Sequence, residues 1–419
     1  MITALDVWAL AGGGGAASLY QTLTGFGRRG HTIDVVGPTI GANHHFGAPA
    51  LPPPAIEGVR FHSFRLPSLS DAPVALPPAL TKADQKLRFA LLFPVLASRL
   101  AGRLLGSAAY DLLYGYEVHG VLAQRLVRRR QRLPLVARFQ GTVMHPYLDR
   151  PLSRLRKYEE VLALGAAADL YVMTDDGTRG DEVLARLNPR ARDRTRFWRN
   201  GLDLDAIRAP TAQEARAARR ALALEPADFV LLTTARLARW KRTDRAIDAL
   251  AALRARGVDA RLIVVGDGEE RAALEAQARR LALTEAVDFR GAVPQGEVQR
   301  YLWAADVFLS LSELSNLGNP LLEAMVTRRC ILTLDEGDTR DLIQDGANGV
   351  LLASDAGPPA IAAALVALAT DAARRRRLAT AARKYAAGHF WSWQERIDAE
   401  VDAVEALLEP GSQRAHGGG

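Results

Sequence analysis

The stretch FVLLTTARLARWKRTDRAIDAL, residues 229–250, contains the three parts of one α/β unit in order. Its first six residues are apolar or β-branched, which is typical of a strand that is buried on both faces. A polar segment with Arg236 and Lys241 follows, and from Asp244 apolar residues recur at helical spacing. Ligands of doubly wound sheets bind beyond the carboxyl ends of the strands, so we expect this polar segment at a binding edge.

The same alternation continues along the chain. We expect helices at 244–256, 269–282, 297–305 and 320–327, with strands between them at 260–268, 287–293 and 307–312. An earlier series has strands expected at 3–10, 31–38, 59–66, 111–116, 134–141 and 169–176, and a long helix at 82–105. Residues 211–226 are rich in Ala, Arg and Glu and separate the two series. The fold class is therefore α/β, with two Rossmann-like doubly wound domains.

Composition narrows the function classes. The chain has 419 residues, of which 48% are hydrophobic, and one cysteine, Cys330, so it forms no intrachain disulfide. This fits a cytoplasmic protein. We find neither a signal peptide nor an apolar run long enough to span a membrane. The net charge of +7 favours anionic partners, but no nucleic-acid-binding motif accompanies it, so we expect no nucleic-acid partner.

The segment LSELSNLGNPLLEAM, Leu311–Met325, has the features of a helix start that holds an anion. Asn319 is a suitable N-cap, and Pro320 fits the first helical position. Gly318 allows a ligand to approach the backbone closely. Free amides and the helix dipole favour a diphosphate here, and the carboxylate of Glu323, one turn further, can accept hydrogen bonds from a ribose diol. The alternative is that Glu323 only complements the positive helix end.

These segments together carry a family resemblance. ARLARWKRTDRAIDAL, LIVVGDGEER, GNPLLEAM and DLIQDGANGVLL occur in the order and spacing of the GT-B retaining glycosyltransferases of family 4, also described as glycosyl transferases group 1. FWRNGLD resembles the element that ends the first domain of that family, AGGGGAASL its glycine-rich loop, and FWSW the place where the last helix crosses back.

The resemblance implies a domain plan and a reaction. It implies an N-terminal acceptor domain at 1–205, a nucleotide-sugar domain at 206–385, a helix packing back at 386–409, and a disordered tail at 410–419, with the domains facing a central cleft. It also implies metal-independent transfer of a sugar, with retention, from a UDP-, GDP- or dTDP-sugar to a hydroxyl acceptor such as a glycan, a lipid-linked acceptor or a secondary metabolite. No cofactor or metal is implied.

The resemblance also assigns residues to roles. Arg236 and Lys241 would stabilise the diphosphate leaving group, and His119, in YGYEVHG, would face the reacting centre; a histidine satisfied within its loop is the alternative. Arg138, Gln140 and Glu117 are candidates for acceptor recognition. The donor-binding set is Glu323, Ser315, Asn316, Leu317, Gly318, Asn319, Pro320, Leu321, Gly266, Gly14 and Gly15.

One position departs from the family. A glutamate that binds the donor sugar usually stands eight residues before the position of Glu323, where this chain has Ser315. Glu313 is two residues early. The donor sugar therefore differs from the common hexoses, or water or Asn316 replaces the carboxylate. Asp203 and Asp205 form a DxD pattern, but their place in NGLDLDAI favours the end of the first domain over a metal site.

Two other classes stay open. GGGGAA followed by Asp34 fits a dinucleotide-binding pattern, which would make the chain an oxidoreductase, although Asp34 lies inside its expected strand. The change at Ser315 raises a third hypothesis, a catalytically inactive GT-B partner protein. Separately, the basic, apolar helix at 82–105 can lie on anionic lipid at the inner face of the membrane, or it can simply cover its own sheet.

Overall fold

The computed structural model describes residues 1–5, 17–39, 54–67, 77–127 and 132–409. The chain divides into two compact units. Unit 1 comprises Met1–Asp175, Arg179–Asn200 and Trp393–Gly419, and unit 2 comprises Asp176–Thr178 and Gly201–Ser392. The chain thus passes into unit 2 after Asn200, a few residues before the boundary at 205 that we expected.

The described part of unit 1 is built on a parallel sheet of seven strands in the order β3-β2-β1-β4-β5-β6-β7. The strands are β1 (Ile2–Thr3), β2 (Ile33–Thr39), β3 (Val59–Arg65), β4 (Leu113–Tyr116), β5 (Leu135–Phe139), β6 (Leu170–Thr174) and β7 (Thr195–Trp198). The order reverses between β1 and β4, which is the switch point of a doubly wound sheet. The predicted α/β class is confirmed for this unit.

Helices cover both faces of this sheet. They are α1 (Ala17–Arg28), α2 (Pro78–Leu87), the π-helix η3 (Arg88–Leu92), α3 (Phe93–Ser107), α4 (Glu117–Leu126), α5 (Pro151–Arg156), α6 (Tyr158–Leu164) and α7 (Gly180–Leu187), with 3-10 turns at η4 (His145–Tyr147) and η5 (Pro189–Arg194). Gly120 is needed where α4 meets β1, because a Cβ atom there would lie 2.3 Å from the carbonyl oxygen of Ile2.

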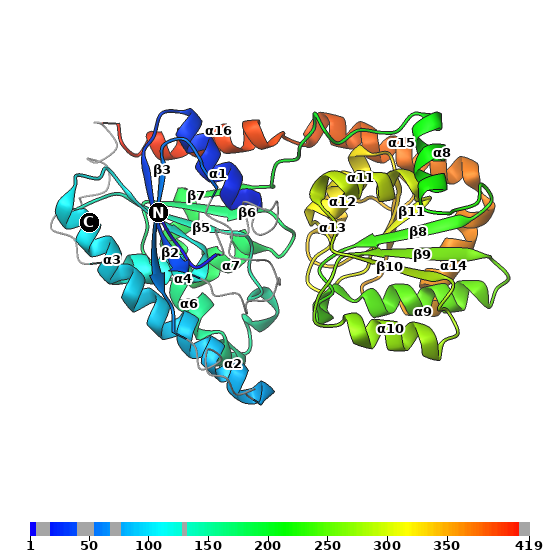
Figure 1. Cartoon of the computed structure of the whole chain (residues 1–419), viewed down its shortest axis with the longest axis horizontal. Coiled ribbons are helices and arrows are strands. Elements are labelled where there is room, and N and C mark those ends of the chain that lie inside the picture. The colour runs from blue at the N-terminus through cyan, green and yellow to red at the C-terminus, as the bar shows by residue number, and fades with distance from the viewer. Residues whose placement is uncertain (6–16, 40–53, 68–76, 128–131, 410–419) are drawn as a thin grey trace. The chain divides into compact units, whose positions relative to one another are not determined.

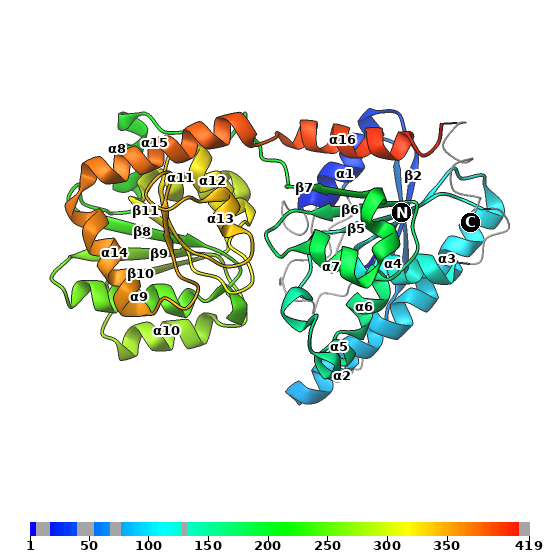
Figure 2. The same ribbon diagram turned by 180° about the vertical axis from the view of Figure 1, so that it is seen from behind.

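The C-terminal helix α16 (Trp393–Glu405) belongs to unit 1, although the chain before it belongs to unit 2. It lies beside α1 and buries Ile397, Val401 and Val404 in the core (Figure 2). The helix expected at 386–409 therefore begins seven residues later, because α15 (Ala372–His389) continues through Gly388.

A long helical segment is formed by α2, η3 and α3, where we predicted one helix at 82–105. Residues Ala83–Ser107 are long and apolar enough to cross a membrane by length and composition, with 33% of the most apolar window buried. The sequence analysis expected no apolar run of spanning length, because five charged residues interrupt this segment. The π-helical turn lies in its middle, at Arg88–Leu92.

Unit 2 has a parallel sheet, six-stranded in the described residues, in the order β10-β9-β8-β11-β12-β13. Its strands are β8 (Phe229–Thr234), β9 (Ala260–Val265), β10 (Val287–Gly291), β11 (Val307–Ser310), β12 (Cys330–Leu334) and β13 (Val350–Leu352). Strand β8 is buried at every position, as its uninterrupted apolar run predicted.

The helices of unit 2 are α8 (Ala212–Ala221), α9 (Thr243–Arg254), α10 (Arg271–Arg280), α11 (Gln295–Ala304), α12 (Asn319–Val326), α13 (Thr339–Leu342), α14 (Pro358–Thr370) and α15, with a 3-10 turn at η6 (Arg239–Lys241). Helices α9 and α10 lie on one face of the sheet and α8, α11 and α12 on the other (Figure 1). Alternate residues of β8 enter the two cores: Leu231 packs with α9, and Leu232 with α8 and α12.

Candidate active site

The polar loop after β8 is held by close backbone contacts with the loop after β9. Ala235 donates a backbone hydrogen bond to Val265 and Leu237 one to Asp267, at 3.0 and 2.9 Å. Gly266 has a φ of +127°, and a Cβ atom there would lie 1.9 Å from the carbonyl oxygen of Ala235. Gly266 therefore permits this approach, which is a structural role at the edge where we expected a donor contact.

Lys241 ends the short helix η6 and is half-buried. Its ammonium lies 4.0 Å from the centroid of the Trp240 ring. Burial lowers the pKa of Lys241 to about 8, although Asp176 opposes this shift. Among the described residues, no carboxylate lies within ion-pair distance of this ammonium. A partly buried cation without an ion pair is suited to an anionic ligand.

Arg236 lies on the same loop and is exposed. Its guanidinium is 3.2 Å from a carboxylate oxygen of Glu269, in a pair in which both side chains are more than half exposed. Such a pair is weak, so the guanidinium can exchange Glu269 for a phosphate at little cost.

The loop after β11 is organised by Asn316, whose side chain is buried. Its Oδ1 accepts hydrogen bonds from the Ser310 hydroxyl and the Ser312 amide, each at 2.9 Å, and its amide donates to the Leu334 carbonyl at 3.2 Å. Leu317 is buried in the core as well. The Asn316 amide is thus used to hold the loop and does not take the place of the missing carboxylate, while the donor contact expected of Leu317 stays a prediction.

Ser315 is also committed to the protein. It is 6% exposed, its hydroxyl donates to the carbonyl of Asp176, and its Oγ accepts from the Leu317 amide at 3.1 Å. Gly177 packs against that hydroxyl. The expectation that the Ser315 side chain contacts the sugar is thus not met, because both hydrogen-bonding functions of the hydroxyl are used inside unit 2.

Helix α12 begins one residue earlier than predicted. Gly318 is the N-cap, Asn319 is the first helical residue and Pro320 the second, so the N-cap has no side chain with which to cap the first turn. The correction follows from the extended conformation of Gly318, whose carbonyl accepts from the Leu321 and Leu322 amides at 3.0 and 3.4 Å. Proline is compatible with the second position as well, because the early amides have no partner within the helix.

Glu323 is buried on α12 and has 5% of its surface exposed. Burial raises the pKa of Glu323 to about 7, while a 2.8 Å hydrogen bond from the Gln295 amide opposes this shift. Gln295 was not among the predicted donor-binding residues. It is the first residue of α11 and follows the carboxyl end of β10, so its place at the same sheet edge is the signal that could have found it.

The described candidate residues of unit 1 all make hydrogen bonds or ion pairs with neighbouring residues of that unit. His119 lies in the first turn of α4, not at a strand end, and its Nε2 is 2.9 Å from a carboxylate oxygen of Glu159. This matches the alternative of a histidine satisfied by its neighbours. Glu117, at the start of α4, has a φ of +66° and accepts from the Gln140 amide at 2.7 Å. The Gln140 side chain donates to the hydroxyls of Ser18 and Tyr116.

Arg138 is 1% exposed. Its guanidinium donates to the Thr174 hydroxyl at 2.7 Å and lies 3.3 Å from the carboxylate of Glu400 on α16. Tyr114 also donates to Glu400, at 2.6 Å. The prediction that Arg138 recognises the acceptor is wrong, because its charge is used in the core to hold the C-terminal helix. Gly14 and Gly15 lie outside the described residues.

Two further motifs have structural roles. Asp203 accepts a hydrogen bond from the Ala206 amide at 3.1 Å, as a turn residue does. Across the described residues, His, Cys, Asp and Glu form no group of three that could hold a metal ion.

Asp34 is buried near the start of β2. Burial opposes its ionisation, but hydrogen bonds from Arg60, His62 and Tyr110 lower the pKa of Asp34 to about 2. Its carboxylate is thus occupied and far from the strand end where a ribose would bind.

The polar loops of unit 2 lie beyond the carboxyl ends of its strands, which is where ligands of doubly wound α/β proteins bind. Residues 214–385 match the family model described as glycosyl transferases group 1. The chain is 29% identical over 308 residues to a D-inositol 3-phosphate glycosyltransferase of Xylanimonas cellulosilytica, covering 70% of this chain and 71% of that one. A GDP-mannose-dependent phosphatidylinositol dimannoside mannosyltransferase of Mycobacterium tuberculosis is 38% identical over 128 residues, which is 28% of this chain and 32% of that one.

Solved structures agree on the fold. A sucrose-phosphate synthase of Thermosynechococcus elongatus superposes with a TM-score of 0.70 at 19% identity, over 93% of this chain and 92% of that one. Anabaena HepE in complex with UDP-glucose gives a TM-score of 0.66 at 19% identity, over 92% and 95%. The chain therefore has the GT-B fold, and its residues 214–385 match the model of the glycosyl transferases group 1. It is a glycosyltransferase enzyme, as the resemblance implied.

Proposed function

We propose that this chain transfers a sugar from a nucleoside-diphosphate sugar to a hydroxyl acceptor, with retention of the anomeric configuration and without a metal ion, as a member of family 4. The observation that supports this most strongly is the presence of two oppositely charged groups at one sheet edge of unit 2, the half-buried Lys241 and the buried Glu323. Lys241 lacks an ion pair among the described residues, and Glu323 has only an amide donor. Each therefore has capacity for a ligand.

The leaving group has a site in this arrangement. Lys241 and Arg236 supply positive charge, and the start of α12 adds the positive end of its helix dipole. Charge that develops on the diphosphate as its bond to the sugar breaks is stabilised by groups that are already in place. These groups can neutralise the diphosphate, which is why the proposal requires no metal ion.

The ribose has a site on the same helix. The ionised carboxylate of Glu323 accepts hydrogen bonds from the two ribose hydroxyls, and Gln295 holds that carboxylate in position. A ribose diol supplies two donors at a fixed spacing, which a carboxylate can accept together.

The reaction then balances without a protein nucleophile. The bond from the anomeric carbon to the diphosphate oxygen breaks, and its electron pair leaves with the diphosphate. The acceptor oxygen attacks from the same face, and its proton passes to the departing phosphate oxygen. The main contribution of the protein is to stabilise the leaving group and orient the acceptor. We keep His119 as a candidate at the reacting centre, with its ring held by Glu159.

The donor is proposed by class. A relative named as GDP-mannose-dependent and a structural neighbour solved with UDP-glucose support a purine or pyrimidine nucleoside diphosphate, that is, a UDP-, GDP- or dTDP-sugar. Relatives named for inositol phosphate, phosphatidylinositol dimannoside and 2-deoxystreptamine support a hydroxyl acceptor.

A panel of sugar nucleotides tests the proposal, with release of the nucleoside diphosphate as the readout, in buffer with and without EDTA. We expect one donor class to be hydrolysed slowly and faster with acceptor, at a rate that EDTA does not change. Binding of donor without any release, over a lysate of acceptors, would instead favour the inactive partner protein. Tight binding of NAD without binding of any nucleoside diphosphate would favour the oxidoreductase.

A membrane contact is a second part of the proposal, and the surface of the long helical segment supports it. Leu80, Leu87, Leu91 and Val95 are exposed at helical spacing. From Gln85 to Tyr110 the sequence has no acidic residue, while Lys86, Arg99 and Arg103 are exposed. An exposed apolar row flanked by cations fits the surface of an anionic bilayer.

A neighbouring segment enlarges this surface. The ammonium of Lys86 lies 4.9 Å from the ring centroid of Tyr158, so the last turn of α2 meets the start of α6. Just before Tyr158, α5 exposes Leu152 and Leu155 at 81% and 69%. We propose peripheral contact with the cytoplasmic face of a membrane through these two segments.

Vesicle flotation distinguishes this contact from a helix that only covers its sheet. We expect binding to vesicles with anionic lipid and little binding to zwitterionic ones, and loss of binding in Leu87→Asp together with Leu91→Asp. The matched control, Leu126→Asp, changes another exposed leucine of unit 1, outside the row. No flotation of the unmodified chain with anionic vesicles removes the membrane part of the proposal and leaves the sugar transfer untouched.

A further inference from the structure

The backbone conformation of Arg242 is the starting observation. Arg242 precedes α9 with φ 51° and ψ 41°, in the left-handed region that residues with a side chain rarely adopt. It is the residue after Lys241. A non-glycine residue stays in this region only where its surroundings hold it there.

The side chain shows what holds it. The guanidinium of Arg242 makes three hydrogen bonds of 2.9–3.1 Å to the carboxylate of Asp244, on its own helix. Its remaining arm donates to Glu313 Oε1 at 2.6 Å, and this carboxylate belongs to the loop after β11. Arg245 lies 3.8 Å from the same oxygen. The Arg242 guanidinium therefore joins the β8–α9 loop to the β11–α12 loop, through two residues that are 71 positions apart in the sequence.

The loop after β11 is strained at the same place. Leu314, directly after Glu313, has a φ of +70°. The Glu313 amide donates to the Trp240 carbonyl at 2.9 Å, and the Ser315 amide donates to the Glu313 carbonyl at 2.8 Å. One unfavourable residue on each side of the Arg242–Glu313 contact indicates that the contact compensates for both.

The two joined loops are the ones that carry the phosphate-binding groups. One ends in Lys241, and the other leads through Ser315 to Gly318, the N-cap of α12, at the positive end of the helix dipole. We propose that Arg242 is a positioning residue. Through Glu313 it holds the β11–α12 loop against the β8–α9 loop, so that both loops contact one diphosphate at a fixed spacing. This role rests on the proposed function of the site.

The contact between the two loops should affect the binding of nucleoside mono- and diphosphates differently. A nucleoside monophosphate needs the ribose site of Glu323 and few phosphate contacts, whereas a nucleoside diphosphate must reach groups on both loops. Loosening the two loops should therefore weaken the diphosphate more than the monophosphate, because misplacement of groups that act together is costly.

Arg242→Gly tests this with little risk to folding, since glycine adopts a positive φ without strain. The control is Arg328→Gly, which makes the same change at another left-handed position, with φ 59° and an exposed side chain. By calorimetry we expect the Kd of the nucleoside diphosphate to rise about three- to tenfold in Arg242→Gly and in Glu313→Gln, with less than about a twofold change for the monophosphate. Arg242→Lys, which keeps the charge, should rescue part of the loss.

Hydrogen exchange of the free protein tests the same role without a nucleotide. We expect the amides of residues 313–317 to exchange about tenfold faster in Arg242→Gly than in Arg328→Gly. Failure of the unmodified chain to bind any nucleoside diphosphate would sink the proposed function, while the exchange rates would still decide whether Arg242 holds the loop. Unchanged exchange, or equal losses of mono- and diphosphate affinity, overturns the positioning role.

Discussion

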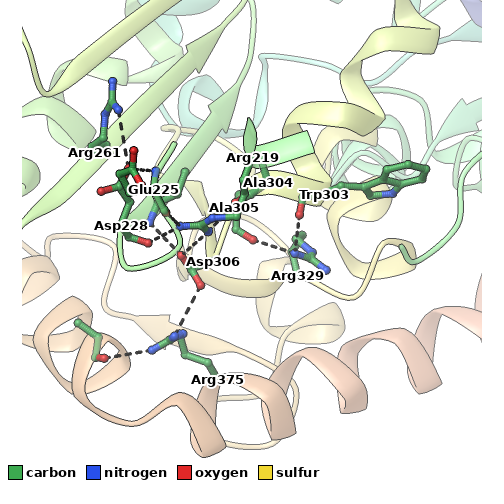
Figure 3. A network of polar contacts seen from close by, with 12 residues as sticks. Arg219, Glu225, Asp228, Arg261, Trp303, Ala304, Ala305, Asp306, Arg329 and Arg375 are labelled. Carbon is green, nitrogen blue, oxygen red and sulfur yellow. Dashed lines mark hydrogen bonds and ion pairs between the residues drawn. The ribbon is translucent and has the colours of Figure 1, made fainter. Parts of the chain in front are cut away.

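The two ends of the unit 2 sheet use charge in opposite ways. At the amino end, the half-buried carboxylate of Asp306 lies 3.3 Å from Arg219 and 3.6 Å from Arg375, and accepts from the Val230 amide at 3.0 Å (Figure 3). Arg329 donates to the Ala305 carbonyl at 2.8 Å. At the carboxyl end, the half-buried Lys241 and the buried Glu323 form no ion pair among the described residues.

This difference between the two ends of the sheet distinguishes charged groups that stabilise the fold from charged groups that are available to a ligand. Burial lowers the pKa of Arg329 to about 10, which leaves it protonated at neutral pH and bonded to carbonyl groups. The shifted pKa values at the carboxyl end, about 8 for Lys241 and about 7 for Glu323, lie where protonation changes under ordinary conditions. Ionisable groups whose pKa lies near neutral pH and that form no ion pair are typical of binding and catalytic sites.

The largest expected effect is on turnover at the carboxyl end. Lys241→Ala and Arg236→Ala should each reduce kcat by about 100-fold or more, because each removes positive charge from the leaving-group site. The melting temperature should stay close to that of the unmodified chain, since neither residue supports the core. Steady-state rates and thermal melts check this, and near-normal rates in both variants would remove the diphosphate role.

The converse experiment is made at the amino end. Asp306→Asn should lower the free energy of unfolding by about 1–3 kcal/mol, because Arg219 and Arg375 lose their common carboxylate. Nucleotide affinity of the folded protein should not change. Denaturant unfolding measures the loss, with the exposed Asp355→Asn as control. A loss of nucleotide affinity at unchanged stability would contradict the division between the two ends.

A smaller effect of opposite sign is expected for Glu323→Gln. The pKa of Glu323 in the folded chain, about 7, lies above its ordinary value of 4.5, so the folded state retains this proton more strongly. The free energy of unfolding therefore falls as the pH rises from about 4.5 to about 7, and above that range the full penalty is present. Glutamine removes the penalty, so the variant should be about 1–2 kcal/mol more stable at pH 8 while binding nucleotide more weakly. Equal stability of the two proteins at pH 8 would show that the carboxylate is not penalised by burial.

Much of the architecture was predictable because the helices and strands follow from local patterns of apolar and polar residues. The apolar run of Phe229–Thr234 and the helix after it needed no information from elsewhere in the chain. The same holds for Lys241 and Glu323, whose places follow from a strand end and a helix start. The positions of elements are thus set by periodicity and by residues a few places apart.

The errors concern side chains whose partners are distant in sequence. Ser315 is bound to the carbonyl of Asp176, 139 positions away, and Arg138 to Glu400 on the C-terminal helix. Polar residues near strand ends look alike in sequence whether they face a ligand or satisfy a buried neighbour. Only the folded arrangement separates the two, because a buried polar group must be paired and its partner can come from anywhere in the chain.

The most direct test of the account is the pH dependence of donor binding, measured by calorimetry with the best sugar nucleotide of the hydrolysis panel. Affinity should rise as Glu323 ionises near pH 7 and fall as Lys241 loses its proton near pH 8. Glu323→Gln should lose the rising limb and Lys241→Met the falling limb. A profile that both variants share with the unmodified chain would contradict the claim that Glu323 and Lys241 hold the donor.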